Sequence, residues 1–314
     1  MRRSLLLALV SVASALLLSE GVVRLVLKRT LDLPQDERSL AYRYDAELGW
    51  FPEPSSERTI AGTRVFHVRH NAKGFRDREP GPKTKPRLAV FGDSFVWGFD
   101  VEADERFTER LAARRRGLDV LNLGVSGYGT DQELLLLRRE LAWLAPDVVV
   151  LLFSQENDHL DNTTNRRYGP YYKPYFEVAS GALVPRGQPV PLPLPYFCER
   201  SPVLGASYLV RAIYATWVGR KHPELRVPDP SHALVAAFRA AVEASGARFA
   251  LLVQGVDEPL LAFAHAERIP ALPLVTRQRY RHFGGHWTPK GHQFVAEQLD
   301  HLLRREGWLG SRAN

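Results

Sequence analysis

The chain has 314 residues, of which 45% are hydrophobic and 25% charged, and its net charge is +7. This length and apolar content are typical of a globular protein with one large domain and additional segments. The single cysteine, Cys198, excludes an intramolecular disulfide and a cysteine zinc cluster. The positive charge is spread along the chain and no nucleic-acid module accompanies it, so we expect no nucleic-acid partner.

The N-terminus combines Arg2 and Arg3 with an uncharged, mostly apolar run from Ser4 to Ser19. The run alone is short for a membrane span, but one tilted helix over residues 4–27 reaches the required length of about 20 residues. Segment 1–30 is therefore predicted to be a signal-anchor in the inner membrane, with the body in the periplasm or outside the cell. The alternative is a signal peptide whose cleavage releases a secreted protein.

Residues 31–86 are polar and rich in turns, and we expect this extension to pack on the main domain. Within it, the alternation of apolar and polar residues over 63–68 predicts a strand. The run "PGPKTKP" (80–86) predicts a linker into the main domain, residues 87–314.

From Arg87 onward, short apolar runs alternate with amphipathic segments. The predicted strands are 87–91, 118–123, 146–153, 248–255 and 270–275, and the predicted helices are 104–117, 131–144 (capped by Thr130 or Asp131), 232–246, 258–269 and 288–307. Strands that are apolar on both faces favour a parallel sheet covered on both sides. The pattern predicts a three-layer α/β/α sandwich with five parallel strands and a site at their carboxyl ends.

An insertion at about 160–230 interrupts this pattern. Residues 171–185 predict a hairpin that turns at Ser180 and Gly181, and the alternate prolines of 189–195 predict an extended strand. The insertion is rich in aromatic residues, which form either a platform for sugar rings or the hairpin's own small core: Tyr168, Tyr171, Tyr172, Tyr175 and Phe176.

The stretch Gly92-Asp93-Ser94 joins the first strand to a helical region. This position presents the Ser94 hydroxyl at the carboxyl end of a strand, near helix-terminal N–H groups that stabilise developing negative charge. The same three residue types are also common in ordinary turns. The triplet gains weight from the blocks that follow it.

Three further blocks lie at strand ends or near the last helix: "NLGVSGYGTDQ" (122–132), "FSQENDHLDN" (153–162) and "GGHWTPKGHQFVAEQL" (284–299). With "GDSF" they resemble, in order and spacing, the blocks of the SGNH hydrolases, also called GDSL-type lipases and esterases, over about residues 87–305. The extension, with "LGW" and "NAKGFRD", is similar to a membrane-anchored bacterial subgroup of these proteins.

The resemblance implies a flavodoxin-like SGNH fold and a role for each matching residue. Ser94 corresponds to the nucleophile and His286 to the general base, with the oxyanion held by the N–H groups of Ser94 and Gly127 and by the Asn157 side chain. We expect Asp93 and Asp158 to support the site and three aromatic residues to bind substrate: Tyr171, Tyr172 and Trp287. No cofactor or metal is expected, because Gly284 and Gly285 interrupt the spacing of His282, His286 and His292 as zinc ligands.

Two positions depart from the family pattern. Gln155 stands where the third block normally has glycine, so it either crowds the turn or contributes to the pocket. Phe283 and Gly284 occupy the positions of the aspartate that normally orients the imidazole. A backbone carbonyl or a carboxylate from elsewhere then replaces it, or the protein is slow or inactive; we expect a working Ser–His dyad.

The sequence thus predicts a serine hydrolase that cleaves an acyl ester, with an O-acetyl group on a carbohydrate or envelope polymer as the favoured substrate. One alternative is a polysaccharide O-acyltransferase that uses the same site. The other is a non-catalytic carbohydrate-binding or assembly protein with a degenerate site.

Overall fold

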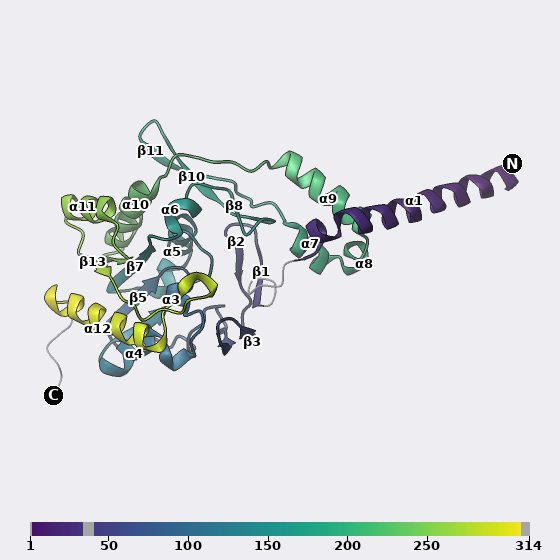
Figure 1. The fold of residues 1–314 in the computed structure, drawn as a ribbon. Helices are drawn as coiled ribbons and strands as arrows, with labels where there is room; N and C mark the ends of the chain where they lie inside the picture. The colour runs from purple at the N-terminus through teal and green to yellow at the C-terminus, as the bar shows by residue number, and fades with distance from the viewer. Residues whose placement is uncertain (1, 34–40, 309–314) are drawn as a thin grey trace.

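Five parallel strands form one sheet at the centre of the body, in a computed structural model that describes residues 2–33 and 41–308 (Figure 1). Their spatial order is β13–β12–β7–β5–β6. All neighbouring pairs are parallel, so the carboxyl ends of the five strands meet at one edge. The strands are β5 (Arg87–Phe91), β6 (Asp119–Asn122), β7 (Val148–Ser154), β12 (Arg248–Gln254) and β13 (Ala271–Leu274).

Helices cover both faces of this sheet. One apolar cluster joins the first face to α5 (Thr130–Leu144), α10 (Ser231–Ala244) and α11 (Glu258–Ala266). A second cluster joins the other face to α4 (Phe107–Arg114) and α12 (Pro289–Arg305). The predicted three-layer α/β/α sandwich with a five-stranded parallel sheet is confirmed.

Two helix boundaries differ from the predictions. The segment 104–117 is divided into a 3-10 turn, η1 (Ala103–Glu105), and α4, which stops at Arg114 because Arg115 leaves the helical region at φ −125° and ψ 68°. The N-cap of α5 is Gly129 rather than Thr130 or Asp131. The Thr130 hydroxyl donates instead to the carboxylate of Asp158, 3.3 Å away.

The N-terminal extension contributes to the core of the body. It contains two hairpins, β1 (Tyr42–Asp45) with β2 (Gly49–Pro52), and β3 (Glu57–Ala61) with β4 (Val65–Arg69). The Trp50 side chain is completely buried, and its carbonyl accepts a 2.6 Å hydrogen bond from Tyr128 Oη in the loop after β6. Residues 34–40 of the predicted extension lie outside the described residues.

The insertion combines hairpins with helices. Its elements are β8 (Arg166–Arg167), β9 (Tyr171–Tyr172), β10 (Tyr175–Ala179), β11 (Ala182–Arg186), α7 (Leu194–Arg200), α8 (Pro202–Gly205) and α9 (Tyr208–Lys221). The predicted turn of the β10–β11 hairpin is confirmed, with Ser180 and Gly181 both left-handed at φ 51° and 79°. The predicted extended strand is wrong at its end, because Leu194 starts α7 and Pro195 fits the first helical turn.

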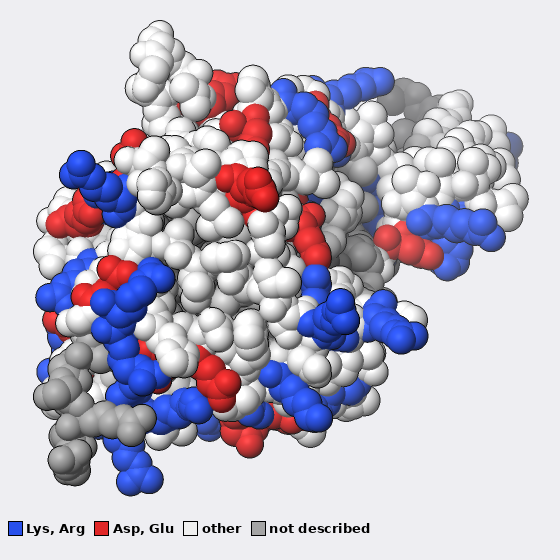
Figure 2. Space-filling view, turned by 60° about the vertical axis from the view of Figure 1, so that its left-hand side comes forward, with Lys and Arg blue, Asp and Glu red and all other residues white. Residues whose placement is uncertain are grey.

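The first helix, α1 (Arg2–Leu31), projects from the body (Figure 1). It is long and apolar enough to cross a membrane, and its most apolar stretch has no buried residue. These properties fit both a signal-anchor and a signal peptide. On the face shown in Figure 2, Lys and Arg lie in scattered groups with Asp and Glu between them.

Candidate active site

Ser94 begins the short helix α3 (Ser94–Trp97), directly after β5. Asp93 is the N-cap of this helix, and its Oδ1 accepts a 2.9 Å hydrogen bond from the backbone N–H of Phe95. The side chains of Phe95, Val96 and Trp97 are buried, which fixes the helix against the body. The half-buried Ser94 side chain thus starts from a rigid turn at the carboxyl edge of the sheet.

The imidazole of His286 lies beside this hydroxyl. Its Nε2 is 2.7 Å from Ser94 Oγ, although the two residues are 192 positions apart. The ring packs against Phe99 and Phe95, with centroid separations of 4.7 and 5.2 Å. His286 is only 9% exposed, so these contacts hold the ring facing the serine.

Gly127 and Asn157 come from the two strands that flank β5. Gly127 lies in the loop after β6 and adopts a left-handed conformation, φ 82°, that side chains other than glycine rarely adopt. Asn157 follows β7, and its Nδ2 donates a 2.9 Å hydrogen bond to Asp93 Oδ2. Its Oδ1 accepts from Ser154 Oγ at 2.5 Å, which fixes the orientation of the amide.

Asp93 and Asp158 are both buried beneath the serine turn. Burial raises the pKa of Asp93, and the hydrogen bond from Asn157 opposes this shift. Burial and the nearby charge of Asp93 raise the pKa of Asp158 well above its ordinary value. Asp158 Oδ2 accepts from the backbone N–H of Ser154 at 2.9 Å, so it holds the end of β7 in place.

A larger acidic cluster, which no sequence pattern predicts, surrounds this pair. It includes three more buried carboxyl groups: Asp131, Glu133 and Asp161. Burial raises the pKa of Glu133 well above its ordinary value and that of Asp161 to about 7. The buried ammonium of Lys173, from the insertion, binds Asp131 and the carbonyl of Asp161 at 3.0 Å. The cluster therefore joins the insertion, through Lys173, to the buried carboxyl groups under Ser94, which we call the floor of the site.

Two of the positions that depart from the family pattern, Gly284 and Gln155, have structural explanations. Gly284 is left-handed at φ 78°, and a Cβ there would lie 3.0 Å from His286 Cε1. An aspartate at position 284 would therefore be strained and press on the His286 ring. The Gln155 side chain turns to the end of β12, where its Oε1 accepts a 3.1 Å hydrogen bond from the N–H of Val256.

An ion pair joins the histidine loop to the asparagine loop. The Arg279 guanidinium donates twice to the Glu156 carboxylate at 2.6 Å, and its Nε donates to the Gly285 carbonyl at 2.5 Å. Hydrogen bonds from Arg279, and to a smaller extent the charge of His286, lower the pKa of Glu156. Glu156 is the neighbour of Asn157 and Gly285 is the neighbour of His286, so Arg279 ties the Asn157 and His286 segments to each other.

Replacing Arg279 by Gln is expected to lower kcat/KM for an ester by about tenfold to a hundredfold, because small displacements of a catalytic group are costly. Most of the loss is expected in kcat, since Arg279 acts through His286 rather than on bound substrate. Steady-state kinetics of the purified variant measure this split.

The control is Arg277→Gln, which changes an exposed arginine two residues earlier. Glu156→Gln should reproduce part of the Arg279 effect, and the double variant should lose less than the two single losses combined, because both remove one interaction. Equal activity of the Arg279 and Arg277 variants would contradict the positioning role.

The "NAKGFRD" motif of the extension supplies two buried side chains that hold the segment after Ser94 and the end of β6. The buried guanidinium of Arg76 donates to the carbonyl of Trp97 at 3.3 Å and to that of Val101 at 2.7 Å. These carbonyls belong to the last residue of α3 and to the loop that follows it. Asp77 Oδ2 accepts a 2.8 Å hydrogen bond from the N–H of Asn122, the last residue of β6.

Two of the three predicted substrate-binding aromatics need correction. Tyr171 is completely buried, with its ring 6.1 Å from that of Trp50, and it therefore belongs to the core. Trp287 is 1% exposed and packs edge-on against Phe95, with ring centroids 4.8 Å apart. Tyr172 is largely buried but lines a surface cavity of about 490 Å³ between the insertion and Tyr44 of β1.

The neighbouring histidines differ in environment from His286. The His292 ring is buried and stacks on Phe107 at an interplanar angle of 11°. Burial lowers its pKa well below the ordinary value, so it is a neutral packing residue. His282 is exposed on the surface of the loop.

The five-stranded α/β/α sandwich, with serine, glycine and asparagine at adjacent strand ends and a late histidine beside the serine, has the architecture of the SGNH hydrolases. The model of the GDSL-like Lipase/Acylhydrolase family matches residues 90–294, a range that contains all four of these positions. The chain belongs to this family. None of the curated proteins compared with it matches.

Several solved structures match this chain, and they share little sequence with it. The crystal structure of TesA is 15% identical, covers 70% of this chain and 98% of its own, and superposes with a TM-score of 0.42. A member of the lipolytic G-D-S-L family from Veillonella parvula is 12% identical, with coverages of 70% and 98% and a TM-score of 0.41. The psychrotrophic esterase EstA from Pseudoalteromonas is 10% identical, with coverages of 71% and 98% and a TM-score of 0.39.

Proposed function

We propose that this protein is a serine esterase of the SGNH type that removes an acyl group, preferentially acetyl, from a carbohydrate or envelope polymer. The observation that carries the proposal is the 2.7 Å contact between His286 Nε2 and Ser94 Oγ, with Asn157 fixed nearby through Asp93. A serine hydroxyl becomes an effective nucleophile when an adjacent base takes its proton.

In the proposed reaction, His286 Nε2 accepts the Ser94 proton while Oγ attacks the ester carbonyl carbon. The carbonyl oxygen becomes an oxyanion, which the N–H groups of Ser94 and Gly127 and the Asn157 amide stabilise. The intermediate collapses, the C–O bond to the alcohol breaks, and His286 returns the proton to the leaving oxygen. Water then attacks the acyl-serine by the same route and releases the carboxylic acid.

The substrate proposal rests on the position of the site. A span formed by α1 would tether the catalytic domain to a membrane, with the body in the periplasm or outside the cell, where envelope polymers lie. Packing of the last part of α1 against α9 supports an anchor that is retained rather than cleaved. The cavity lined by Tyr172 and Tyr175 supports contact with a sugar polymer on the insertion.

The test uses the full chain in detergent micelles with 4-nitrophenyl acetate, 4-nitrophenyl decanoate and an O-acetylated polysaccharide. We expect acetate release from the polysaccharide and a kcat/KM for the acetyl ester that exceeds that for the decanoyl ester. Adding an acceptor oligosaccharide separates hydrolysis from transfer, because an acyltransferase acetylates the sugar faster than water takes the acyl group. Acetate release no faster than that of the Ser94→Ala variant would favour a non-catalytic binding protein.

A further inference from the structure

The last part of α1 has two different faces. Glu20, Arg24 and Leu31 lie on one side of the helix at helical spacing, and this side contacts α9. Val22, Leu25 and Val26 lie on the opposite side and are 60%, 85% and 69% exposed. Glu20 and Arg24 thus join the buried Leu31 in protein contacts, while three apolar side chains are left on the outer face, where a helix in water normally carries polar residues.

The polar face is held by specific hydrogen bonds. The Glu20 carboxylate caps the start of α9, accepting from Ser207 Oγ at 2.7 Å and from the N–H groups of Tyr208 and Leu209 at 3.0 and 2.8 Å. Arg24 pairs with Glu20 at 3.1 Å and donates to the carbonyl of Ala206 at 3.3 Å. The charges that would be costly in lipid are therefore compensated by the protein.

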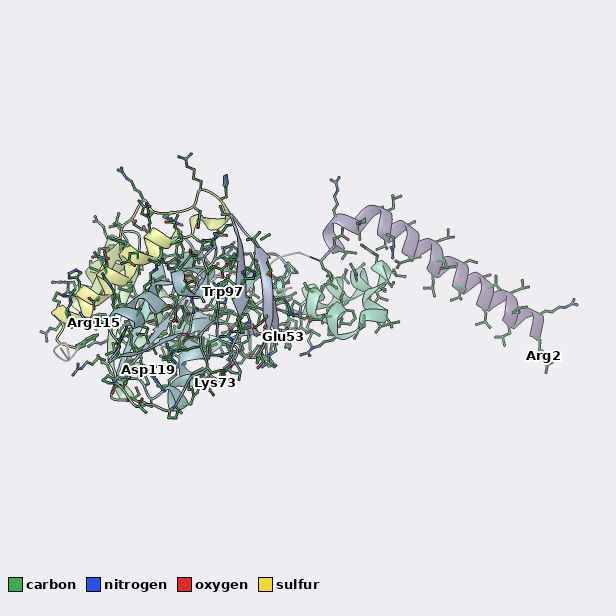
Figure 3. All side chains as sticks on the ribbon, turned by 90° about the horizontal axis from the view of Figure 1, so that it is seen from below. Arg2, Glu53, Lys73, Trp97, Arg115 and Asp119 are labelled. Atoms are coloured by element: carbon green, nitrogen blue, oxygen red, sulfur yellow. The ribbon has the colours of Figure 1, made fainter. Side chains whose placement is uncertain are left out.

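Helices α7–α9 (residues 194–221), which we call the collar, form the partner of this face. Figures 1 and 3 show the collar beside the C-terminal part of α1, with the rest of α1 projecting beyond it toward Arg2. The short helix α8 exposes Val203 and Leu204, at 86% and 53%, immediately before the Ala206 carbonyl that Arg24 binds. Along the axis of α1, these two side chains thus lie at about the same height as the exposed residues Val22, Leu25 and Val26.

We propose that the collar is a membrane-surface element: α8 inserts Val203 and Leu204 into the headgroup and acyl boundary of the bilayer that α1 spans. The distance from Arg3 to Glu20 along a helix is about 26 Å, close to the hydrocarbon thickness of about 30 Å. Residues 22–26 and α8 then meet the boundary on the body side, where partly buried amphipathic elements bind lipid. Arg24 and Lys28 remain 54% and 61% exposed beside their ion pairs with Glu20 and Asp32, so their side chains can also meet anionic headgroups at this depth.

This inference rests on the proposed membrane anchor, and it adds an orientation. A single membrane helix leaves the domain free to rotate about the helix axis and to tilt. A collar that also binds the membrane surface would hold one side of the domain toward the membrane. The Lys173 ion pair ties the insertion that carries the collar to the floor of the site. The collar therefore sets the direction in which Ser94 faces from the membrane.

The experiment measures depth in the bilayer. The full chain, with Cys198→Ala, is reconstituted in vesicles of phosphatidylcholine and phosphatidylglycerol and labelled with an environment-sensitive fluorophore at Leu17→Cys, Val203→Cys or Val178→Cys. Val178 is the matched control, since it is a 56% exposed valine on the β10 hairpin. Lipids that carry a quencher near the headgroup should reduce emission at position 203 by about twofold or more relative to position 178.

Fluorophosphonate labelling of Ser94 or circular dichroism shows that each variant is folded, and Leu204→Cys gives a second probe in α8. Quenching at position 17 without quenching at 203 and 204 would overturn the collar proposal and leave the anchor intact. Absence of quenching at position 17 would overturn both the anchor and the collar. Neither result concerns acetate release, so a failure of the proposed chemistry remains distinguishable.

Discussion

Replacing Ser94 by alanine is expected to lower kcat for ester hydrolysis by about 10⁴-fold or more, because the acyl-enzyme route requires its oxygen. The stability of the fold should change little. The side chain is half-buried, and its hydroxyl contacts His286 rather than the core. A fluorophosphonate probe reacts with an activated serine, so the same variant should lose covalent labelling, detected by mass spectrometry on the intact protein.

The matched control is Ser245→Ala, which removes an exposed hydroxyl at the end of α10 whose Oγ donates to the Val242 carbonyl at 2.6 Å. This variant should label and turn over substrate as the parent protein does. If Ser94→Ala retains labelling, the nucleophile is a different residue. If the probe does not label the parent protein, Ser94 and His286 do not form an active dyad under those conditions.

The central sheet was predictable because its signal is local. Each strand is a short run of apolar residues bounded by glycine, proline or charge, as in "RLAVF" and "PDVVVLLF", and each helix has one apolar face. Buried parallel strands produce this pattern wherever they occur. Errors fell at helix ends, where a distant partner decided the geometry: Thr130 Oγ1 donates to Asp158, so Gly129 rather than Thr130 caps α5.

The positions of the predicted site residues followed from topology, but their supporting contacts did not. A strand order that places β5 between β6 and β7 brings the ends of these strands together. Arg279 and Glu156 are 123 positions apart in the sequence, and the residues around each of them do not predict their contact. One sequence feature did point to such a contact. Positions 283 and 284 lack the aspartate that normally orients the histidine, so another residue had to hold the histidine loop in place.

The insertion was the least predictable part. Its aromatics admitted two interpretations, and the burial of Tyr171 and Phe176 shows that the hairpin uses them largely for packing. The start of α7 could not be predicted from the alternate prolines, because proline is compatible with both an extended chain and the first turn of a helix. Ser207 caps α9 locally, but Glu20, nearly 190 residues earlier, also binds the first N–H groups of this helix, which a local pattern does not reveal.

Asn157→Ala is the second large effect that we expect, a fall of about 10²- to 10³-fold in kcat with little change in KM. In the proposed mechanism the amide donates to negative charge that exists only in the transition state, so its loss should leave binding of the neutral ester unchanged. The side chain also has a structural role, because its Nδ2 donates to Asp93 and its Oδ1 accepts from Ser154. Steady-state kinetics alone do not separate these two roles.

Two further variants separate them. Ser154→Ala removes the hydrogen bond that orients the amide but keeps the donor, so we expect it to lose less than about tenfold. Asn157→Asp preserves the shape but replaces the donor with a carboxylate facing the buried Asp93, so it should be at least as impaired as Asn157→Ala. The rate of fluorophosphonate labelling should fall in parallel, since the phosphonyl oxygen occupies the oxyanion position. An Asn157→Ala variant no slower than Ser154→Ala would remove Asn157 from the oxyanion hole and leave it as a tie between β7 and the serine turn.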